Sequence, residues 1–216
     1  MPALFPRWSN VAFRVALLFG ALVLLGVPSF LMGWVRTPAV TEQYSSPVQP
    51  VPFDHAMHAG ALGIDCRYCH STVERSASAG IPATSVCVPC HNQVWFQSPV
   101  FAPVRRSLAT NQPIAWQRVN KLPDFVFFNH AIHVNKGVGC ESCHGRVDEM
   151  HRIQQAAPLT MGWCLDCHRD PAPHLRPVEQ MTAMGWTPIE PQNILGADLM
   201  KRYHVQRFTN CTACHR

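Results

Sequence analysis

The sequence predicts a mostly irregular chain of short α-helices behind one N-terminal transmembrane helix. Three observations lead to this fold class. An uncharged apolar run occupies residues 15–35. The remaining chain holds most of the nineteen prolines and long stretches without hydrophobic periodicity. The five-residue motif Cys-Xaa-Xaa-Cys-His occurs five times and uses all ten cysteines.

The apolar run, VALLFGALVLLGVPSFLMGWV, is the predicted membrane anchor. At about 1.5 Å per residue a helix of this length spans about 31 Å, which is enough to cross the hydrocarbon core. Arg7 and Arg14 precede it without a nearby acid, so the positive-inside rule places residues 1–14 in the cytoplasm. The alternative, a cleaved signal peptide, has an apolar region of about 7–15 residues and a small-residue cleavage site. No such site follows Trp34, and we expect a retained anchor.

Residues 36–50 are polar and spaced by prolines, which is typical of a linker. Residues 51–216 then form the domain that carries the motifs. The formal charge of +5 comes from scattered arginines and lysines. No basic block indicates nucleic-acid binding.

Each motif predicts a covalently attached haem. On one helical turn the two sulfurs and the imidazole lie on one face, so the thiols can form thioethers while the histidine binds the iron. Zinc ribbons and disulfide frameworks are the alternatives, but neither requires a histidine after the second cysteine. The predicted attachment residues are Cys66 and Cys69, Cys87 and Cys90, Cys140 and Cys143, Cys164 and Cys167, and Cys211 and Cys214. The predicted proximal iron ligands are His70, His91, His144, His168 and His215.

Five haems in residues 51–216 leave little polypeptide for a conventional apolar core. We therefore expect short helices and loops wrapped around haem, with porphyrin faces serving as the core and almost no sheet. Covalent attachment takes place after export, which predicts a periplasmic location for this domain.

A second motif, Phe-Xaa-His-Xaa-Xaa-His, stands before the first and third haem motifs. It begins at Phe53 and again at Phe128, and the first copy has one extra residue before the cysteine. Each copy opens a predicted dihaem module, residues 51–91 and 126–168, and the fifth site lies alone at 211–215. The paired histidines are His55 and His58, and His130 and His133.

These paired histidines are the predicted distal iron ligands. Side chains three residues apart on a helical turn point the same way, whereas the two axial ligands of one iron approach from opposite faces. Each pair must therefore serve two different haems. The zinc alternative requires His-Glu-Xaa-Xaa-His, which the sequence lacks.

The fifth distal ligand is predicted to be His174. Met150 is the alternative, since it could supply a thioether, and a thioether ligand would raise the potential of that haem. His151 and His204 are interpreted as surface histidines. A helix is expected over residues 193–206, with Asn193 as its cap. Between the modules, residues 92–126 are rich in aromatic side chains, which either cover porphyrin or dock another subunit.

The doubled Phe-Xaa-His-Xaa-Xaa-His resembles the class III, c3 and c7-like multihaem cytochromes. The stretches GIDCRYCHSTVE, LPDFVFFNHAIHVNKGVGCESCHGRVDEM and LTMGWCLDCHR, with the anchor and five sites, resemble the pentahaem cytochrome subunit of bacterial alternative complex III. The resemblance covers nearly the whole chain after the anchor.

This resemblance implies a relay subunit of a quinol:electron-acceptor oxidoreductase in a respiratory or photosynthetic chain, not catalytic alone. Its expected partners are an integral membrane quinol-oxidising subunit, an iron-sulfur subunit, a monohaem cytochrome c and a haem-copper oxidase, with the domain in the periplasm and the anchor in the bacterial cytoplasmic membrane. One alternative is a membrane-anchored quinol dehydrogenase that feeds a periplasmic reductase. Another is a reductase with an open iron, which often carries Cys-Xaa-Xaa-Cys-Lys, and here all five motifs end in histidine.

Overall fold

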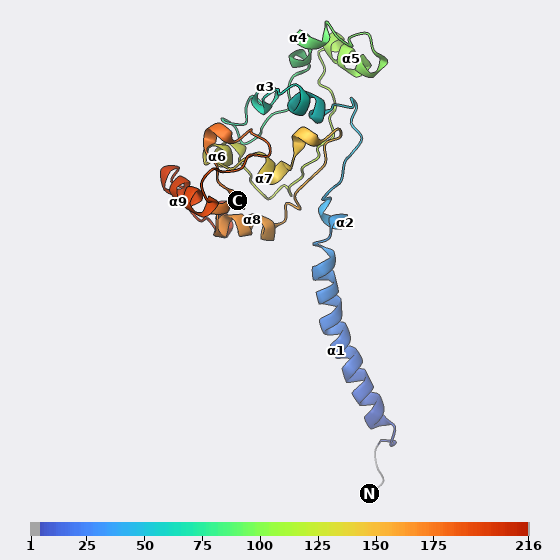
Figure 1. Cartoon of the computed structure of the whole chain (residues 1–216). Coiled ribbons are helices and arrows are strands. Elements are labelled where there is room, and N and C mark those ends of the chain that lie inside the picture. The colour runs from blue at the N-terminus through green and yellow to red at the C-terminus, as the bar shows by residue number, and fades with distance from the viewer. Residues whose placement is uncertain (1–4, 216) are drawn as a thin grey trace. The chain divides into compact units, whose positions relative to one another are not determined.

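The computed structural model describes residues 5–215, and its contacts divide the chain into two units, residues 1–42 and 43–216 (Figure 1). Within the described residues there is no β-strand, only two isolated bridges. The helical segments are short, apart from the first. They are α1 (Ser9–Trp34), α2 (Pro38–Thr41), η1 (Ala56–Ala61), α3 (Cys66–Cys69), η2 (Thr84–Cys87), α4 (Val88–His91), η3 (Pro99–Phe101), α5 (Ala102–Thr110), α6 (His130–Asn135), α7 (Glu141–His144), η4 (Val147–Glu149), α8 (Met161–Arg169), η5 (Ala172–His174), η6 (Val178–Gln180), α9 (Gln192–Arg202) and η7 (Cys211–Ala213).

The first unit is dominated by α1, a candidate membrane anchor. It starts at Ser9, six residues before the expected apolar span, and contains 26 residues with a mean hydropathy of 2.4 and no buried side chain. At about 1.5 Å per residue its length is about 39 Å. The helix is therefore long enough to cross a bilayer, and its exposed surface is apolar.

The second unit holds all five haem motifs and has a small apolar core. Nine apolar residues in the described part of the chain are buried. Most of them fall into two separate clusters, one around Val104 and Phe101 and the other around Val134 and Met181. Protein side chains alone therefore bury little apolar surface in this unit.

Short helices in this unit begin at side-chain caps that the sequence supplies. The carboxylate of Asp65 accepts a hydrogen bond from the Arg67 amide at the start of α3 (2.8 Å). Thr160 caps α8 in the same way, and Asn129 caps α6. Such caps satisfy backbone donors that a four- to nine-residue helix would otherwise leave unpaired.

The C-terminal helix α9 spans Gln192–Arg202, so the expected range of 193–206 is four residues too long at its end, and Pro191 rather than Asn193 precedes it. It packs on η5, where a side chain at Gly196 would stand 2.1 Å from the Ala172 carbonyl oxygen. Gln192 donates two hydrogen bonds across the same contact, to the carbonyls of Ala172 (3.0 Å) and Leu175 (2.8 Å). Glycine is required at position 196 because the backbones of α9 and η5 approach each other closely there.

Part of the expected linker is incorporated into the second unit. The Tyr44 amide donates to the Gln155 carbonyl (2.7 Å), and the Gln155 amide donates to the Ser45 carbonyl (3.1 Å). Ser46 and Gln43 add side-chain hydrogen bonds to the same segment, residues 153–156. The chain is therefore fixed to the haem-motif unit from residue 43 onward.

Candidate haem sites

Each Cys-Xaa-Xaa-Cys-His motif lies on a helical turn. The first occupies α3, the second runs from η2 into α4, the third forms α7, the fourth lies within α8 and the fifth includes η7. All ten cysteines are free thiols, so none is consumed in a disulfide. The helical turn gives every motif the arrangement that covalent haem attachment requires, with both sulfurs and the imidazole on one side.

The structure brings three of the four paired histidines opposite motif histidines. The ring centroids of His58 and His91 are 6.0 Å apart. Those of His130 and His144 are 6.3 Å apart with the rings nearly parallel, at 5°. The rings of His133 and His168 are 6.0 Å apart.

These separations fit an iron between the two rings. A metal–imidazole bond is about 2.0–2.1 Å long, so two such bonds plus half a ring on either side amount to about 6 Å between centroids. Two imidazoles stacked directly on each other would lie closer. The residues present therefore fit bis-histidine haem iron, and the pair on α6 faces two different motifs.

The fourth paired histidine, His55, lies beside His70. Burial, with nearby His70 and His58, lowers the pKa of His55 to about 4. Its Nδ1 is buried without a hydrogen-bond partner among the described residues. Burial likewise lowers the pKa of His144 to about 4, with nearby His130, His70 and His55 contributing. Both rings are therefore neutral at physiological pH, which is the form that binds metal.

Hydrogen bonds fix the tautomer of most of these imidazoles. A backbone carbonyl only accepts, so an Nδ1 facing it carries the proton and leaves Nε2 free to bind iron. Six of the predicted ligand histidines face a carbonyl in this way. The pairs are His58 with Asp54 (2.7 Å), His70 with Gly80 (2.7 Å), His91 with Val94 (3.3 Å), His130 with Ala77 (2.9 Å), His133 with Asn129 (2.8 Å) and His215 with Phe125 (3.2 Å).

His144 differs because a side chain, Asn120, faces its Nδ1. The Asn120 amide nitrogen lies 3.2 Å from that atom, and the Asn120 amide oxygen is buried without a partner in the described chain. Turning the amide by half a turn would let its oxygen accept the Nδ1 proton and would satisfy the buried oxygen. In that orientation Nε2 of His144 is free for iron, as in the other sites.

The fifth motif has a different surrounding. Within residues 5–215, the ring contact of His215 is to Phe125, at 5.6 Å between centroids. Among the described residues, neither His174 nor Met150, the two candidates for the fifth distal ligand, has a contact with His215. His174 is exposed at the end of η5, and the methyl group of Met150 packs towards Gly145.

A buried ion pair beside the third motif was not anticipated from the sequence. Arg176 pairs with Glu141, the residue after Cys140, and their side chains are only 9% and 17% exposed. The guanidinium also donates to the Ala183 carbonyl (3.0 Å) and lies over the Trp186 ring. Neither spacing nor composition marks these residues, since they are 35 positions apart.

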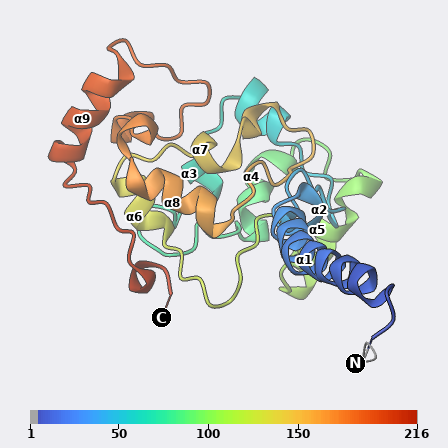
Figure 2. The same ribbon diagram turned by 90° about the horizontal axis from the view of Figure 1, so that it is seen from below.

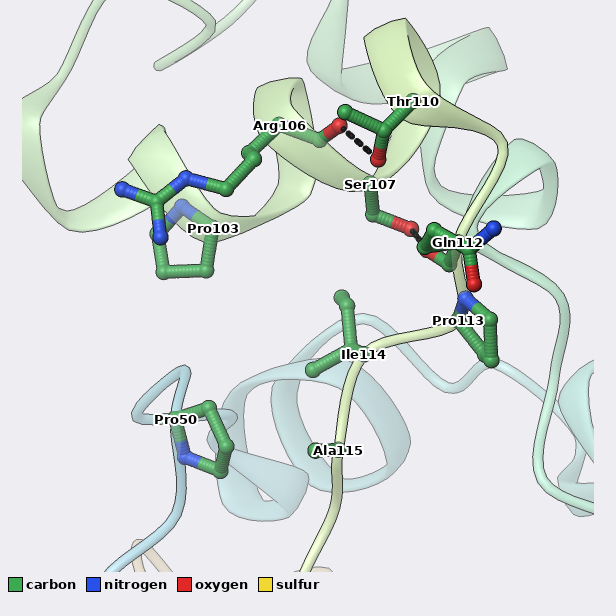
Figure 3. A pocket seen from close by; sticks show the side chains of 9 residues that line it. All are labelled: Pro50, Pro103, Arg106, Ser107, Thr110, Gln112, Pro113, Ile114 and Ala115. Atoms are coloured by element: carbon green, nitrogen blue, oxygen red, sulfur yellow. Dashed lines mark hydrogen bonds between the residues drawn. The ribbon is translucent and has the colours of Figure 1, made fainter.

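A groove of about 220 Å³ lies apart from the motifs, between α5 and the segment 112–115 (Figure 3). Pro50, Pro103 and Ile114 form its apolar lining, and the Arg106 side chain extends along it. Its described lining contains neither cysteine nor histidine. The groove therefore has no ligand for haem iron.

Comparison with known proteins supports this geometry. Residues 126–216 match the family model described as cytochrome c7 and related cytochrome c. Residues 126–216, which contain the third, fourth and fifth motifs, are therefore similar to helical, c7-like multihaem cytochromes, and the chain also has one apolar N-terminal helix long enough to cross a membrane.

A curated relative is the "Menaquinone reductase, multiheme cytochrome c subunit" of Nitratidesulfovibrio vulgaris (strain Hildenborough). It is 34% identical over 119 residues, which cover 55% of this chain and 55% of the relative. The chain thus spans about half the length of the curated relative that it matches.

Proposed function

We propose that this chain is a membrane-anchored pentahaem cytochrome c that relays electrons within a quinone-linked oxidoreductase complex. The observation that carries the proposal is the placement of His58, His130 and His133 about 6 Å from the histidines of three different motifs. Haem iron would supply one-electron transfer by alternating between its ferric and ferrous states.

The chain's own residues would hold and orient the cofactors. The cysteines listed above attach the porphyrin edges, and the motif histidines bind from one side. His55, His58, His130 and His133 bind from the other, so that η1 joins the first two sites and α6 joins the third and fourth. Phe53 and Phe128 stack on His58 and His133 at 4.3 and 4.4 Å and hold those rings in place.

With two protein ligands on an iron, no position is left for a substrate. The relay role and the absence of catalysis by the isolated chain follow from this ligation. The expected spectrum of the oxidised protein is low-spin. A stoichiometric high-spin ferric signal sensitive to cyanide would contradict a relay with all irons doubly ligated.

The complex is proposed from the resemblance to the pentahaem subunit of alternative complex III and from the relative's name, which includes menaquinone reductase. The resemblance implies a quinol-oxidising membrane subunit, and the relative's name joins a multihaem cytochrome subunit to a menaquinone reductase. The proposed setting is the cytoplasmic membrane, with the N-terminus in the cytoplasm and residues 51–216 in the periplasm. The proposed partners are a quinol-oxidising membrane subunit, an iron-sulfur subunit, a monohaem cytochrome c and an oxidase.

Copurification from detergent-solubilised membranes tests this setting. We expect an iron-sulfur subunit and a polytopic membrane subunit to accompany the chain, and five haems per chain by the pyridine haemochrome and intact mass. Quinol oxidation by the isolated chain would favour the quinol dehydrogenase alternative. For the fifth site, EPR of His174→Ala and Met150→Ala decides which residue ligates, because only loss of the true ligand converts that haem to high-spin.

A further inference from the structure

We propose that the five haem motifs lie in a line in the order second, first, third, fourth, fifth, so that the second and fifth motifs are the two ends of the relay. This inference rests on the proposed function. It identifies which sites exchange electrons with partner proteins, and it differs from the order along the sequence.

The second and first motifs are joined by η1. His58 on this helix faces His91 of the second motif at 6.0 Å, and its carbonyl accepts a hydrogen bond from the amide of Ile64, two residues before Cys66 of the first motif (3.0 Å). The helix η1 thus faces the second motif and leads directly into the first, which makes these two motifs neighbours.

The first and third motifs meet directly. The thiols of Cys66 and Cys140 are close enough for each to shift the pKa of the other, which lowers the pKa of Cys66 and raises that of Cys140. One short segment contacts both motifs: the Cys140 amide donates to the Met181 carbonyl (2.9 Å), and the Thr182 hydroxyl donates to the Asp65 carboxylate (2.9 Å). The first motif is therefore in contact with both the second and the third.

The third and fourth motifs are joined by α6, whose His130 and His133 face His144 and His168. The third motif thus lies between the first and the fourth.

The fourth and fifth motifs are neighbours at the C-terminal end. Burial and the nearby Cys214 thiol raise the pKa of Cys164. Arg207, just before the fifth motif, lies 3.7 Å from Asp170, just after the fourth. The Phe127 amide donates to the Cys214 carbonyl (2.8 Å), which holds the fifth motif against the segment that leads into α6.

The arrangement of helices agrees with this order. Figures 1 and 2 both place α3 and α7 between α4 and α8. Exposed cysteines occur only in the two proposed end motifs among the described residues, as Cys90 and Cys211, whereas the other eight are partly buried. The two ends of the line are thus the places where a partner's redox centre can approach most closely.

Removing one site at a time distinguishes this order from the sequence order. In full-length holoprotein, Cys66→Ser with Cys69→Ser removes the first site, and Cys87→Ser with Cys90→Ser is the matched control that removes the second. Neighbouring ferric haems broaden each other's EPR signals. Loss of the first site should leave the second haem isolated, with an uncoupled low-spin signal from one haem per chain, and the control should leave four coupled haems.

The opposite result, an isolated haem only when the second site is removed, would overturn the proposed order. If a variant does not mature, the order of the sites is tested in the wild-type protein instead. Iron positions in the density of the solubilised complex should place the first site between the second and the third, and a terminal first site would refute the inference. Fewer than five haems in the wild-type protein would instead refute the proposed function itself.

Discussion

The two ligand helices, η1 and α6, place the same side chains at the same distances although one contains an extra residue. Phe53 stands 4.8 Å from His55 and 4.3 Å from His58, and Phe128 stands 4.7 and 4.4 Å from its two histidines. In η1 the additional residue is accommodated as a π-helix, with the Leu62 amide bonded to the Met57 carbonyl five residues back. A one-residue insertion thus changes the helix type and preserves the ligand geometry.

The modules differ more in what surrounds the motif than in the ligands. The residue after the first cysteine is charged in both, Arg67 in the first module and Glu141 in the second. Arg67 pairs with Asp65 at the surface, with side chains 43% and 41% exposed, whereas Glu141 pairs with Arg176 in the interior. Equivalent positions therefore differ in their expected contribution to stability.

The largest expected effect comes from breaking the interior pair. Glu141→Gln leaves the Arg176 charge buried without its counter-ion, which should lower the free energy of unfolding by about 3 kcal/mol. The matched substitution Arg67→Gln should cost less than about 1 kcal/mol because water screens the exposed pair. Unfolding of the holoprotein in guanidinium chloride, monitored by the haem absorbance, measures the loss of unfolding free energy in both variants. Equal losses in the two variants would contradict the difference between the modules.

Gly60→Ala tests whether the π-helix depends on its contact with η4. A Cβ at this position would stand 2.3 Å from the Asp148 carbonyl oxygen, so one backbone must move. We expect a loss of about 1–3 kcal/mol in unfolding free energy. Gly162→Ala on α8 is the control, since nothing lies within 4 Å of its added Cβ, and it should be neutral or slightly stabilising.

Asn120→Asp should change one haem potential and leave the other four nearly unchanged. A carboxylate accepts the Nδ1 proton of His144 more strongly than an amide does, which makes the imidazole a stronger donor and lowers the potential of its iron. Asn120→Leu removes the acceptor and should shift the same potential upwards. Spectroelectrochemical titration measures both shifts. Shifts of the same sign for the two variants would show that Asn120 acts only through packing.

The smallest effect is expected at the exposed pair and depends on pH. The hydrogen bond from Arg67 lowers the pKa of Asp65 from its usual 3.8 to about 2. Its stabilisation is therefore present above pH 4 and is lost as the pH falls towards 2. Asp65→Asn should cost less than about 1 kcal/mol at neutral pH. The difference from wild type should disappear near pH 2, and a constant difference would assign the effect to helix capping instead.

The spacing of residues along the sequence predicted the features of the fold that depend on neighbouring residues. The helical turns at the motifs, the apolar N-terminal helix and the lack of strands in residues 5–215 all follow from short sequence patterns. In α6, His130 and His133 face the histidines of two different motifs, as the three-residue spacing predicts, while iron ligation by these residues stays a prediction. The partners of His174 and Met150 depend on distant segments, and spacing does not determine them.

Long-range contacts account for what sequence reasoning missed. Asn120 meets His144 across 24 positions and Arg176 meets Glu141 across 35. The extra residue in the first module was visible in the sequence, but only the backbone shows that it forms a π-helix. The spatial order of the motifs likewise depends on contacts such as that between Cys66 and Cys140, which no periodicity encodes.

The small apolar core has a consequence for how the protein is made. With nine buried apolar residues in its described part, the exported chain has little to fold around before haem is attached. A chain with an empty haem site should therefore be open to proteolysis. We expect the amount of this protein in a cell to follow the supply of haem, because chains with an empty site would be degraded.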